Sequence, residues 1–223
     1  MKKALLFRGG WDGHEPVQTS EMVAEGLKKH GMEVDIFDHQ ECLLDPDLNS
    51  KYAVIVPVWT MGKLPPEPEK ALLEAVRNGA GIGGWHGGMC DAFRENTEYQ
   101  FMTGGQWVAH PGNIIDYRVE IIGKDPIIDG ISDFDMHSEQ YYMHTDPGNE
   151  VLAVTRFNGT VYPWIDGTIM PVIWKRHYGK GRVFFSSLGH TAEDFRRVPQ
   201  VLEIIIRGIL WAGHGKKNAW TIA

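Results

Sequence analysis

The segment with the strongest chemical signal is the run Gly84-Trp85-His86-Gly87-Gly88. Its spacing is that of a nucleophile elbow, where a sharp strand-to-helix turn lifts the central side chain above a sheet. An imidazole in that place can act as an acid, a base or a metal ligand. A tight turn around a packed histidine is the alternative, but glycines on both sides are needed only where the backbone is strained. We therefore expect His86 to be catalytic, with Trp85 and Gly87 beside the substrate.

A second group of candidates lies in residues 137–144, which read His-Ser-Glu-Gln-Tyr-Tyr-Met-His. Alternate residues of an extended chain share a face, so we expect His137, Glu139 and Tyr141 to point the same way. A carboxylate between two polar aromatic side chains suits proton transfer, metal binding or recognition of a hydroxyl group, and we expect Tyr141 to contact the substrate. A polar edge strand that faces water is the alternative interpretation.

Two further histidines stand where loops are expected to approach a ligand. His190 follows an apolar run, and Glu193 and Asp194 can orient its imidazole, although Asp194 is better placed to cap the next helix. His110 ends the segment Gly-Gly-Gln-Trp-Val-Ala-His, and the proline after it favours an extended backbone there. We expect His190 to take part in catalysis and both histidines to be available as metal ligands.

The first loop and the tryptophans supply the expected substrate contacts. His14 and Glu15 follow the first apolar run, although they can equally cap the first helix and interact with its dipole. Flat aromatic faces at the mouth of a pocket suit sugar rings. Four tryptophans fall at expected strand ends or in the loops above them, and some of them will instead close the core: Trp11, Trp59, Trp85 and Trp107.

The elements that must position these residues follow from the hydrophobic pattern. Buried strands are predicted at 4–7, 33–37, 52–59 and 80–84, with helices at 16–30 and 66–78 and a short helix near Gly88. This alternation predicts an α/β fold with a mostly parallel sheet and helices on both faces. Ligands bind outside the carboxyl ends of strands in such sheets, where the candidate residues stand.

The middle of the chain has a different character. Residues 99–167 are rich in glycine, aspartate and aromatic residues, with short strands predicted at 117–122 and 151–156. We expect loops and added strands at the sheet edge, and the pattern leaves open whether they form a lid or the contact of a homo-oligomer. Strands at 171–175 and 181–187 and a helix at 198–213 complete one predicted domain, 1–223.

Composition excludes several classes of function. The 223 residues carry a net charge of -7, which disfavours nucleic acid, and residues 4–7 are too short an apolar run for a signal peptide. No stretch is long enough to cross a membrane, so a cytoplasmic protein is expected. The two cysteines, Cys42 and Cys90, have no CxxC spacing, and Cys90 is expected to be inert inside a helix. No glycine-rich nucleotide motif is present, so we expect no nucleotide cofactor.

The order of motifs resembles that of the ThuA-like family, named for trehalose utilisation. GWHGG, GGQWVAHP, a Glu-x-Tyr segment and GKGRVFFSSLGH carry this resemblance, which spans nearly the whole chain. The family is similar in fold to the class I glutamine amidotransferases, a flavodoxin-like sheet whose elbow carries cysteine and whose later strand end carries histidine. Here His86 stands at the cysteine position, and His190 matches the later histidine by location only. Glutamine hydrolysis through a thioester is therefore not expected.

The resemblance also implies a function. Family members act in bacterial disaccharide catabolism alongside an oxidoreductase that makes 3-keto sugars. We therefore expect an enzyme that isomerises or cleaves a keto-sugar or 3-keto-disaccharide, with Glu139 or His86 as base. A divalent metal, zinc or manganese, is expected on His86, His110, Glu139 and His190. Two alternatives stay open: a non-catalytic sugar-binding or regulatory module, and a metal-dependent hydrolase of another small molecule.

Overall fold

Five parallel strands form the half of the sheet that carries the elbow. The structure is a computed structural model that describes residues 2–214. The parallel strands lie in the order β2-β1-β3-β4-β11. Their bounds are β1 Lys3–Gly10, β2 Glu33–Phe37, β3 Val54–Thr60, β4 Gly81–Trp85 and β11 Gly181–Ser186. Nearly every residue of β3 is buried, as expected of an apolar strand covered on both faces.

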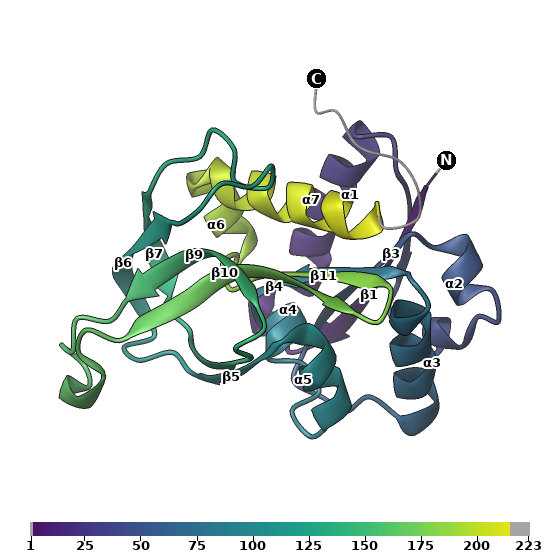
Figure 1. Cartoon of the computed structure of the whole chain (residues 1–223), viewed down its shortest axis with the longest axis horizontal. Coiled ribbons are helices and arrows are strands. Elements are labelled where there is room, and N and C mark those ends of the chain that lie inside the picture. The colour runs from purple at the N-terminus through teal and green to yellow at the C-terminus, as the bar shows by residue number, and fades with distance from the viewer. Residues whose placement is uncertain (1, 215–223) are drawn as a thin grey trace.

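Antiparallel strands continue the same sheet beyond β11 in the order β10-β9-β6-β7 (Figure 1). They are β6 Ile114–Ile121, β7 Phe134–Glu139, β9 Glu150–Arg156 and β10 Ile169–Tyr178. A separate two-stranded sheet pairs β5, Gly105–Ala109, with β8, Tyr142–Thr145. The strands predicted near 117–122, 151–156 and 171–175 are confirmed, and β5, β7 and β8 are the added strands expected in the middle of the chain.

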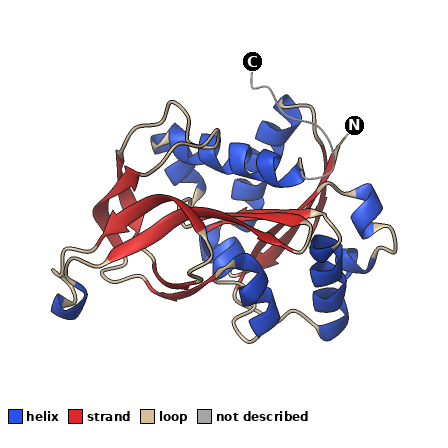
Figure 2. Cartoon of the chain, viewed as in Figure 1, coloured by secondary structure: helices blue, strands red, loops and turns tan. Residues whose placement is uncertain are grey.

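Helices cover both faces of the sheet, as Figures 1 and 2 show. One face carries α1, Pro16–Lys29, α6, Ala192–Arg197, and α7, Pro199–Gly213. The other carries α2, Leu48–Lys51, α3, Pro66–Arg77, α4, His86–Cys90, and α5, Thr97–Thr103. Residues 2–214 also contain three short 3-10 helices: η1 Asp12–His14, η2 Gln40–Leu44 and η3 Pro163–Ile165. The predicted α/β class with helices on both faces is confirmed.

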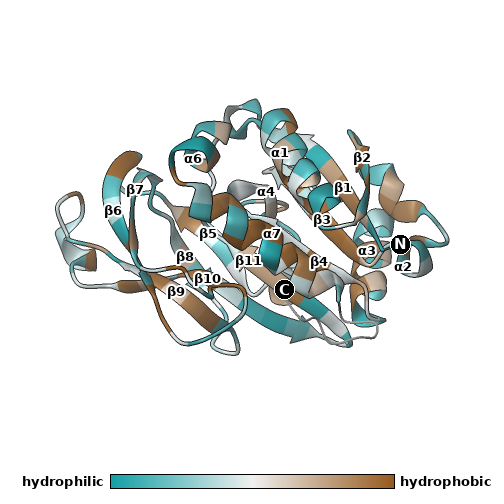
Figure 3. Ribbon diagram, turned by 90° about the horizontal axis from the view of Figure 1, so that it is seen from above, coloured by the Kyte–Doolittle hydropathy of each residue, from teal (hydrophilic) through white to brown (hydrophobic). Residues whose placement is uncertain are grey.

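Local sequence explains where the main helices begin. Pro16, Pro66 and Pro199 occupy the first turns of α1, α3 and α7, where a missing N–H costs nothing. Each helix then buries one apolar stripe, and in α7 that stripe is broad. Figure 3 shows hydrophobic residues along α7 and on the strands beneath it. No helix among residues 2–214 has both the length and the apolar character needed to cross a bilayer.

The direction of the parallel strands decides where the candidate residues meet. The carboxyl ends of β1, β4 and β11 lie at the same edge of the sheet. His14 comes just after β1, His86 directly follows β4, and His190 comes shortly after β11. Three histidines that are distant in sequence are therefore brought to one edge by the strand pairing.

Candidate functional site

The elbow predicted around His86 is present. His86 is the first residue of α4 and has a φ of 47°, a left-handed conformation that side chains rarely adopt. A Cβ at Gly84 would lie 2.8 Å from Cβ of Met89, and one at Gly88 would lie 3.1 Å from Cα of Val58. The flanking glycines therefore permit α4 to turn back tightly against β3 and β4, which confirms the prediction of a strained turn.

His86 presents one nitrogen to the site and is held by the other. Its Nδ1 donates to the carbonyl oxygen of Ser187 at 2.8 Å, so its Nε2 carries a free lone pair when the ring is neutral. Burial lowers the pKa of His86 to about 3, which keeps the ring neutral. Nε2 lies 3.2 Å from Oε2 of Glu139 and 3.1 Å from Nδ1 of His190. A backbone carbonyl that fixes the tautomer in this way is typical of a metal-ligating histidine.

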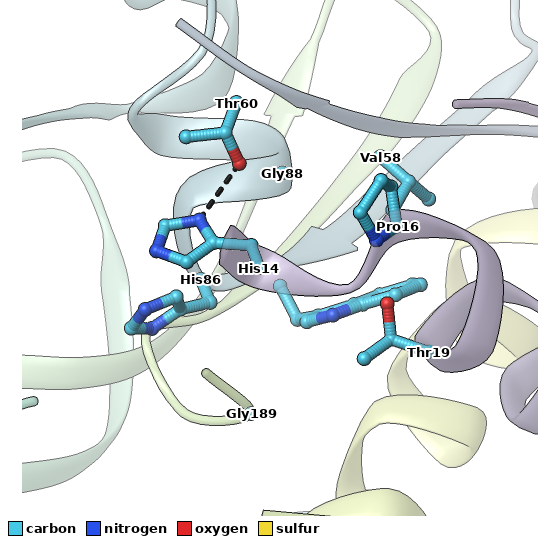
Figure 4. Close-up of a pocket in the computed structure, with 9 residues that line it drawn as sticks. His14, Pro16, Thr19, Val58, Thr60, His86, Gly88 and Gly189 are labelled. Atoms are coloured by element: carbon cyan, nitrogen blue, oxygen red, sulfur yellow. Dashed lines mark hydrogen bonds between the residues drawn. The ribbon is translucent and has the colours of Figure 1, made fainter. Parts of the chain in front are cut away.

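Two more histidines complete the cluster around the Glu139 carboxylate. His14 is held through Nδ1 by Thr60 Oγ1 at 2.8 Å (Figure 4), and its Nε2 lies 3.8 Å from Glu139 Oε2. Nδ1 of His190 lies 3.4 Å from the same oxygen. The candidate ligand atoms of His14, His86, Glu139 and His190 all lie within 4.8 Å of one another.

Glu139 stands at the end of β7 and is buried. Burial by itself raises the pKa of this carboxyl, but the surrounding imidazoles of His14, His190 and His86 outweigh it and hold the pKa of Glu139 well below its usual range. Glu139 is therefore an anion surrounded by imidazoles. A carboxylate with such a low pKa is a weak base, so it is better suited to bind a cation than to remove a proton.

The donor set fits a divalent cation. Three imidazole nitrogens and one carboxylate oxygen are ligands that zinc takes in tetrahedral sites, and manganese accepts the same types. Ser187 and Thr60 already hold the far nitrogens of His86 and His14. A small pocket between α1 and α4 adjoins the histidines, lined in part by Pro16, Val58 and Gly189 (Figure 4). The cluster therefore has the ligands and the outer hydrogen bonds of a metal centre.

The sequence matches a known protein family over nearly its whole length. The family model of ThuA, described as trehalose utilisation, matches residues 3–212. The chain belongs to the ThuA family. This membership confirms the resemblance carried by the elbow and the later motifs, and it indicates a role related to carbohydrate use. No match was found among curated proteins.

Solved structures agree with the fold of this ThuA-family protein. A ThuA-like protein from Parabacteroides merdae superposes with a TM-score of 0.75 at 20% identity, covering 99% of this chain and 92% of that one. One from Bacteroides uniformis gives 0.76 at 19% identity, with 95% and 91% covered. The glutaminase domain of Trypanosoma brucei CTPS with bound acivicin gives 0.55 at 13% identity, with 99% and 97% covered. The glutamine amidotransferase-like fold is therefore shown, with His86 at the elbow.

The cluster that could hold a metal differs from the expected ligand set at a single residue. The cluster contains His14, expected as a substrate contact, and leaves out His110, expected as a ligand. His110 instead approaches the outer oxygen of Glu139, with its Nε2 3.7 Å from Oε1. The sequence contained one indication that His14 belongs to the site: like His86 and His190, it follows a predicted parallel strand. That signal could not separate a ligand from a helix cap.

Glu15 and Asp194 connect segments rather than capping their own helices. Oε2 of Glu15 accepts from the backbone N–H of Ala192 at 2.9 Å, so it caps α6 and not α1. Oδ2 of Asp194 accepts from Ser138 Oγ at 2.6 Å and from the N–H of His190 at 3.0 Å. These two carboxylates tie the loops of His14 and His190 to each other and to β7. The alternative by which Glu15 would cap the first helix is therefore not what the structure shows, and Asp194 orients His190 through its backbone.

The expected shared face of residues 137, 139 and 141 fails at His137. That imidazole bonds Asp116 Oδ1 at 2.7 Å on the surface, away from Glu139. Asp135 and His137 are both exposed on this face of β7, whereas the residue between them faces the buried side. Only at Glu139, where the strand ends against the elbow, does this face become covered. Tyr141 is on the buried side, stacked on His86 at 4.1 Å between ring centroids.

The four candidate tryptophans lie in different environments. Trp11 is half exposed and meets His14 edge-on, with ring centroids 4.7 Å apart. Trp59 and Trp107 are partly buried, and Trp85 is buried against Phe195. Trp85 packs in the core and also lines the small pocket beside His86. Gly87 serves the cluster by leaving room for the His14 ring, which a Cβ would approach to 2.5 Å.

The inert character expected of Cys90 agrees with its surroundings. Cys90 ends α4 and is buried, and burial raises the pKa of its thiol. A thiol of this kind forms little thiolate near neutral pH. Cys90 therefore supplies no nucleophilic thiolate to the elbow.

Proposed function

We propose that this ThuA-family protein is a metal-dependent enzyme that isomerises or cleaves a keto-sugar or a 3-keto-disaccharide. The observation that carries the proposal is the convergence of His14, His86, Glu139 and His190 around one point at the elbow. The carbohydrate substrate is supported by the family description. When bound, a divalent cation would polarise the ketone and acidify the neighbouring C–H bond.

The chain's own groups divide between holding the cation and moving a proton. Glu139 has a low pKa, and the one free nitrogen of His86 faces inward, so both suit ligation better than proton abstraction. His110 touches Glu139 from outside the cluster, and its ring reaches the surface. Removal of a proton beside the ketone is the first step of either isomerisation or elimination. We assign that proton transfer to His110.

The test combines metal analysis with turnover of a 3-keto-disaccharide. We expect near-stoichiometric zinc or manganese in the purified protein, and its loss in His86→Ala and Glu139→Ala. His110→Ala should keep the metal but lose at least about 100-fold in turnover, the usual effect of removing an acid–base group. His137→Ala is the matched control, because that histidine is exposed and bonded only to Asp116. Full turnover by metal-free protein would refute the proposal.

A second candidate function has one observation in its favour. Four protein ligands fill a tetrahedral shell, and closed sites of that kind are usually structural. With a structural metal, the chain would be a sugar-binding module without turnover. Metal that is retained, sugar that binds and no product from any 3-keto-disaccharide would favour this function over the enzyme.

A further inference from the structure

Tyr141 carries a buried hydroxyl with no partner. Its side chain is 3% exposed and stacks on His86, yet its OH makes no hydrogen bond within residues 2–214. Leaving a hydroxyl unpaired in the interior costs free energy, so buried polar groups in folded proteins nearly always have a partner. An unpaired hydroxyl beside a candidate metal centre therefore points to a ligand group.

The neighbouring residues repeat this pattern. Trp107 Nε1 and His110 Nδ1 are also buried without a partner in the described chain. The Trp107 ring lies 6.3 Å from the Tyr141 ring and 5.5 Å from the His110 ring, centroid to centroid. Of the five such atoms in the described residues, four belong to Tyr141 and to the β5 segment with its following loop: Gln106, Trp107, His110 and Tyr141. Unpaired polar atoms are thus concentrated next to Glu139.

Arg94 fixes Trp107 and determines which part of it is available. The Arg94 guanidinium lies over the indole ring at 4.4 Å, so one ring face is covered. Arg94 donates from Nε and Nη2 to the two oxygens of Asp91 at 2.5 and 2.9 Å, and Asp91 is buried. The indole therefore offers its N–H edge more than a stacking face. The charge of Arg94 is neutralised by Asp91, so the surface does not favour an anion.

We propose that Trp107, His110 and Tyr141 form a subsite that binds neighbouring hydroxyl groups of a neutral sugar beside the metal centre. An indole N–H donates only, whereas a phenol and an imidazole nitrogen can donate or accept, and a hydroxyl group can answer each of them. Arg94 and Asp91 act as positioning residues for Trp107. The inference rests on the proposed function for its substrate class, but binding at this subsite does not require turnover.

The test is calorimetric titration of the purified full-length protein with trehalose and with D-glucose, the metal content of each sample being measured. Tyr141→Phe removes only the unpaired hydroxyl, and Trp107→Phe keeps a ring under Arg94 but removes the N–H. Each change should weaken binding about tenfold, the usual value of one hydrogen bond. Metal content should not change. D-glucuronate should bind no better than D-glucose.

Thermal unfolding distinguishes a ligand-binding role of the Tyr141 hydroxyl from a structural role. Because the Tyr141 hydroxyl has no partner, Tyr141→Phe should unfold at the same temperature or higher. The matched control is Tyr99→Phe, since Tyr99 is equally buried but donates to the carbonyl oxygen of Met89 at 3.0 Å. That variant should unfold at a lower temperature and bind sugar normally.

The outcomes separate the two proposals. Unchanged sugar affinity in Tyr141→Phe, or wild-type protein that binds neither sugar at millimolar concentration, would overturn the subsite and indicate that the atoms are only hydrated. Weakened binding in both variants of a protein that holds no metal would support the subsite and refute the metal-dependent function.

Discussion

At the scale of single residues, the site depends on hydrogen bonds that hold each histidine from outside the cluster. Ser187 holds Nδ1 of His86, Thr60 holds Nδ1 of His14, and Asp194 holds the backbone of His190. These contacts leave the remaining nitrogens pointing at Glu139. Hydrogen bonds within the chain thus fix the orientation of His86 and His14 and the backbone of His190.

The pKa of His86 leads to a prediction about acid. The folded protein keeps His86 neutral down to about pH 3, whereas in the unfolded chain it takes a proton near its ordinary value of 6.5. The unfolded state therefore binds more protons between these values, and the contribution of His86 to stability is lost as the pH falls from 6.5 towards 3. The lowered pKa of Glu139 acts in the same direction.

Urea unfolding of chelator-treated protein at a series of pH values between 7 and 4 measures this effect. We expect the free energy of unfolding to fall with pH, and to fall less steeply in His86→Gln. His137→Ala is the control and should keep the wild-type slope, because that histidine is exposed. Identical slopes for wild type and His86→Gln would contradict the assignment of a buried neutral imidazole.

At the scale of elements, the sequence predicted those helices, strands and turns that are determined by patterns within a few residues. The bounds of β2 and the elbow after β4 were predicted well, because apolar runs and glycines act over a few residues. The exposure of His137 was not predicted. Alternation shows which residues share one side of a strand, but it does not show whether other elements cover that side. The inclusion of His14 in the cluster depends on the pairing of β1 with β3, a long-range contact that no local pattern encodes.

The elbow gives a prediction at this scale. Gly84→Ala should destabilise the fold by about 1–3 kcal/mol, the usual cost of overpacking, because the new Cβ would lie 2.8 Å from Cβ of Met89. It should also displace His86 and lower the metal content. Chemical denaturation and metal analysis measure the two effects.

Gly213→Ala serves as the control for that change. The added methyl group there meets its neighbours at ordinary distances of 3.4 Å or more, at the end of α7. It should be neutral or slightly stabilising. A Gly84→Ala protein with wild-type stability and metal content would show that the turn tolerates a side chain.

At the scale of the whole molecule, the two halves of the sheet each contribute to one centre. The parallel half supplies His14, His86 and His190, and the antiparallel half supplies Glu139 from its far strand β7. β7 stands four places from β11 in the sheet order, yet its last residue meets His190. The antiparallel half must therefore curl back, and Ser138 bonded to Asp194 fixes it there.

Removal of a cation from the proposed centre should therefore lower the stability of the whole fold. A cation bound only by the folded state at a concentration 1,000 times its dissociation constant adds about 4 kcal/mol of stability. We expect a chelator to lower the unfolding temperature of the wild type and to leave that of Glu139→Ala unchanged. Calorimetry measures both. An equal response in the two proteins would place the stabilising cation elsewhere.

The wide spacing of the ligands has a consequence for synthesis on the ribosome. His86 and Glu139 are 53 residues apart along the chain, and His86 and His190 are 104 apart. His190 follows β11, which comes last in sequence among the strands of the described residues, so the elbow leaves the ribosome long before its partners do. A nascent chain can hold a cation in all four ligands only after nearly the whole sheet has been made. Metal loading of the proposed centre would therefore be a late, post-translational event, and a chain interrupted before β11 would be released without the complete cluster.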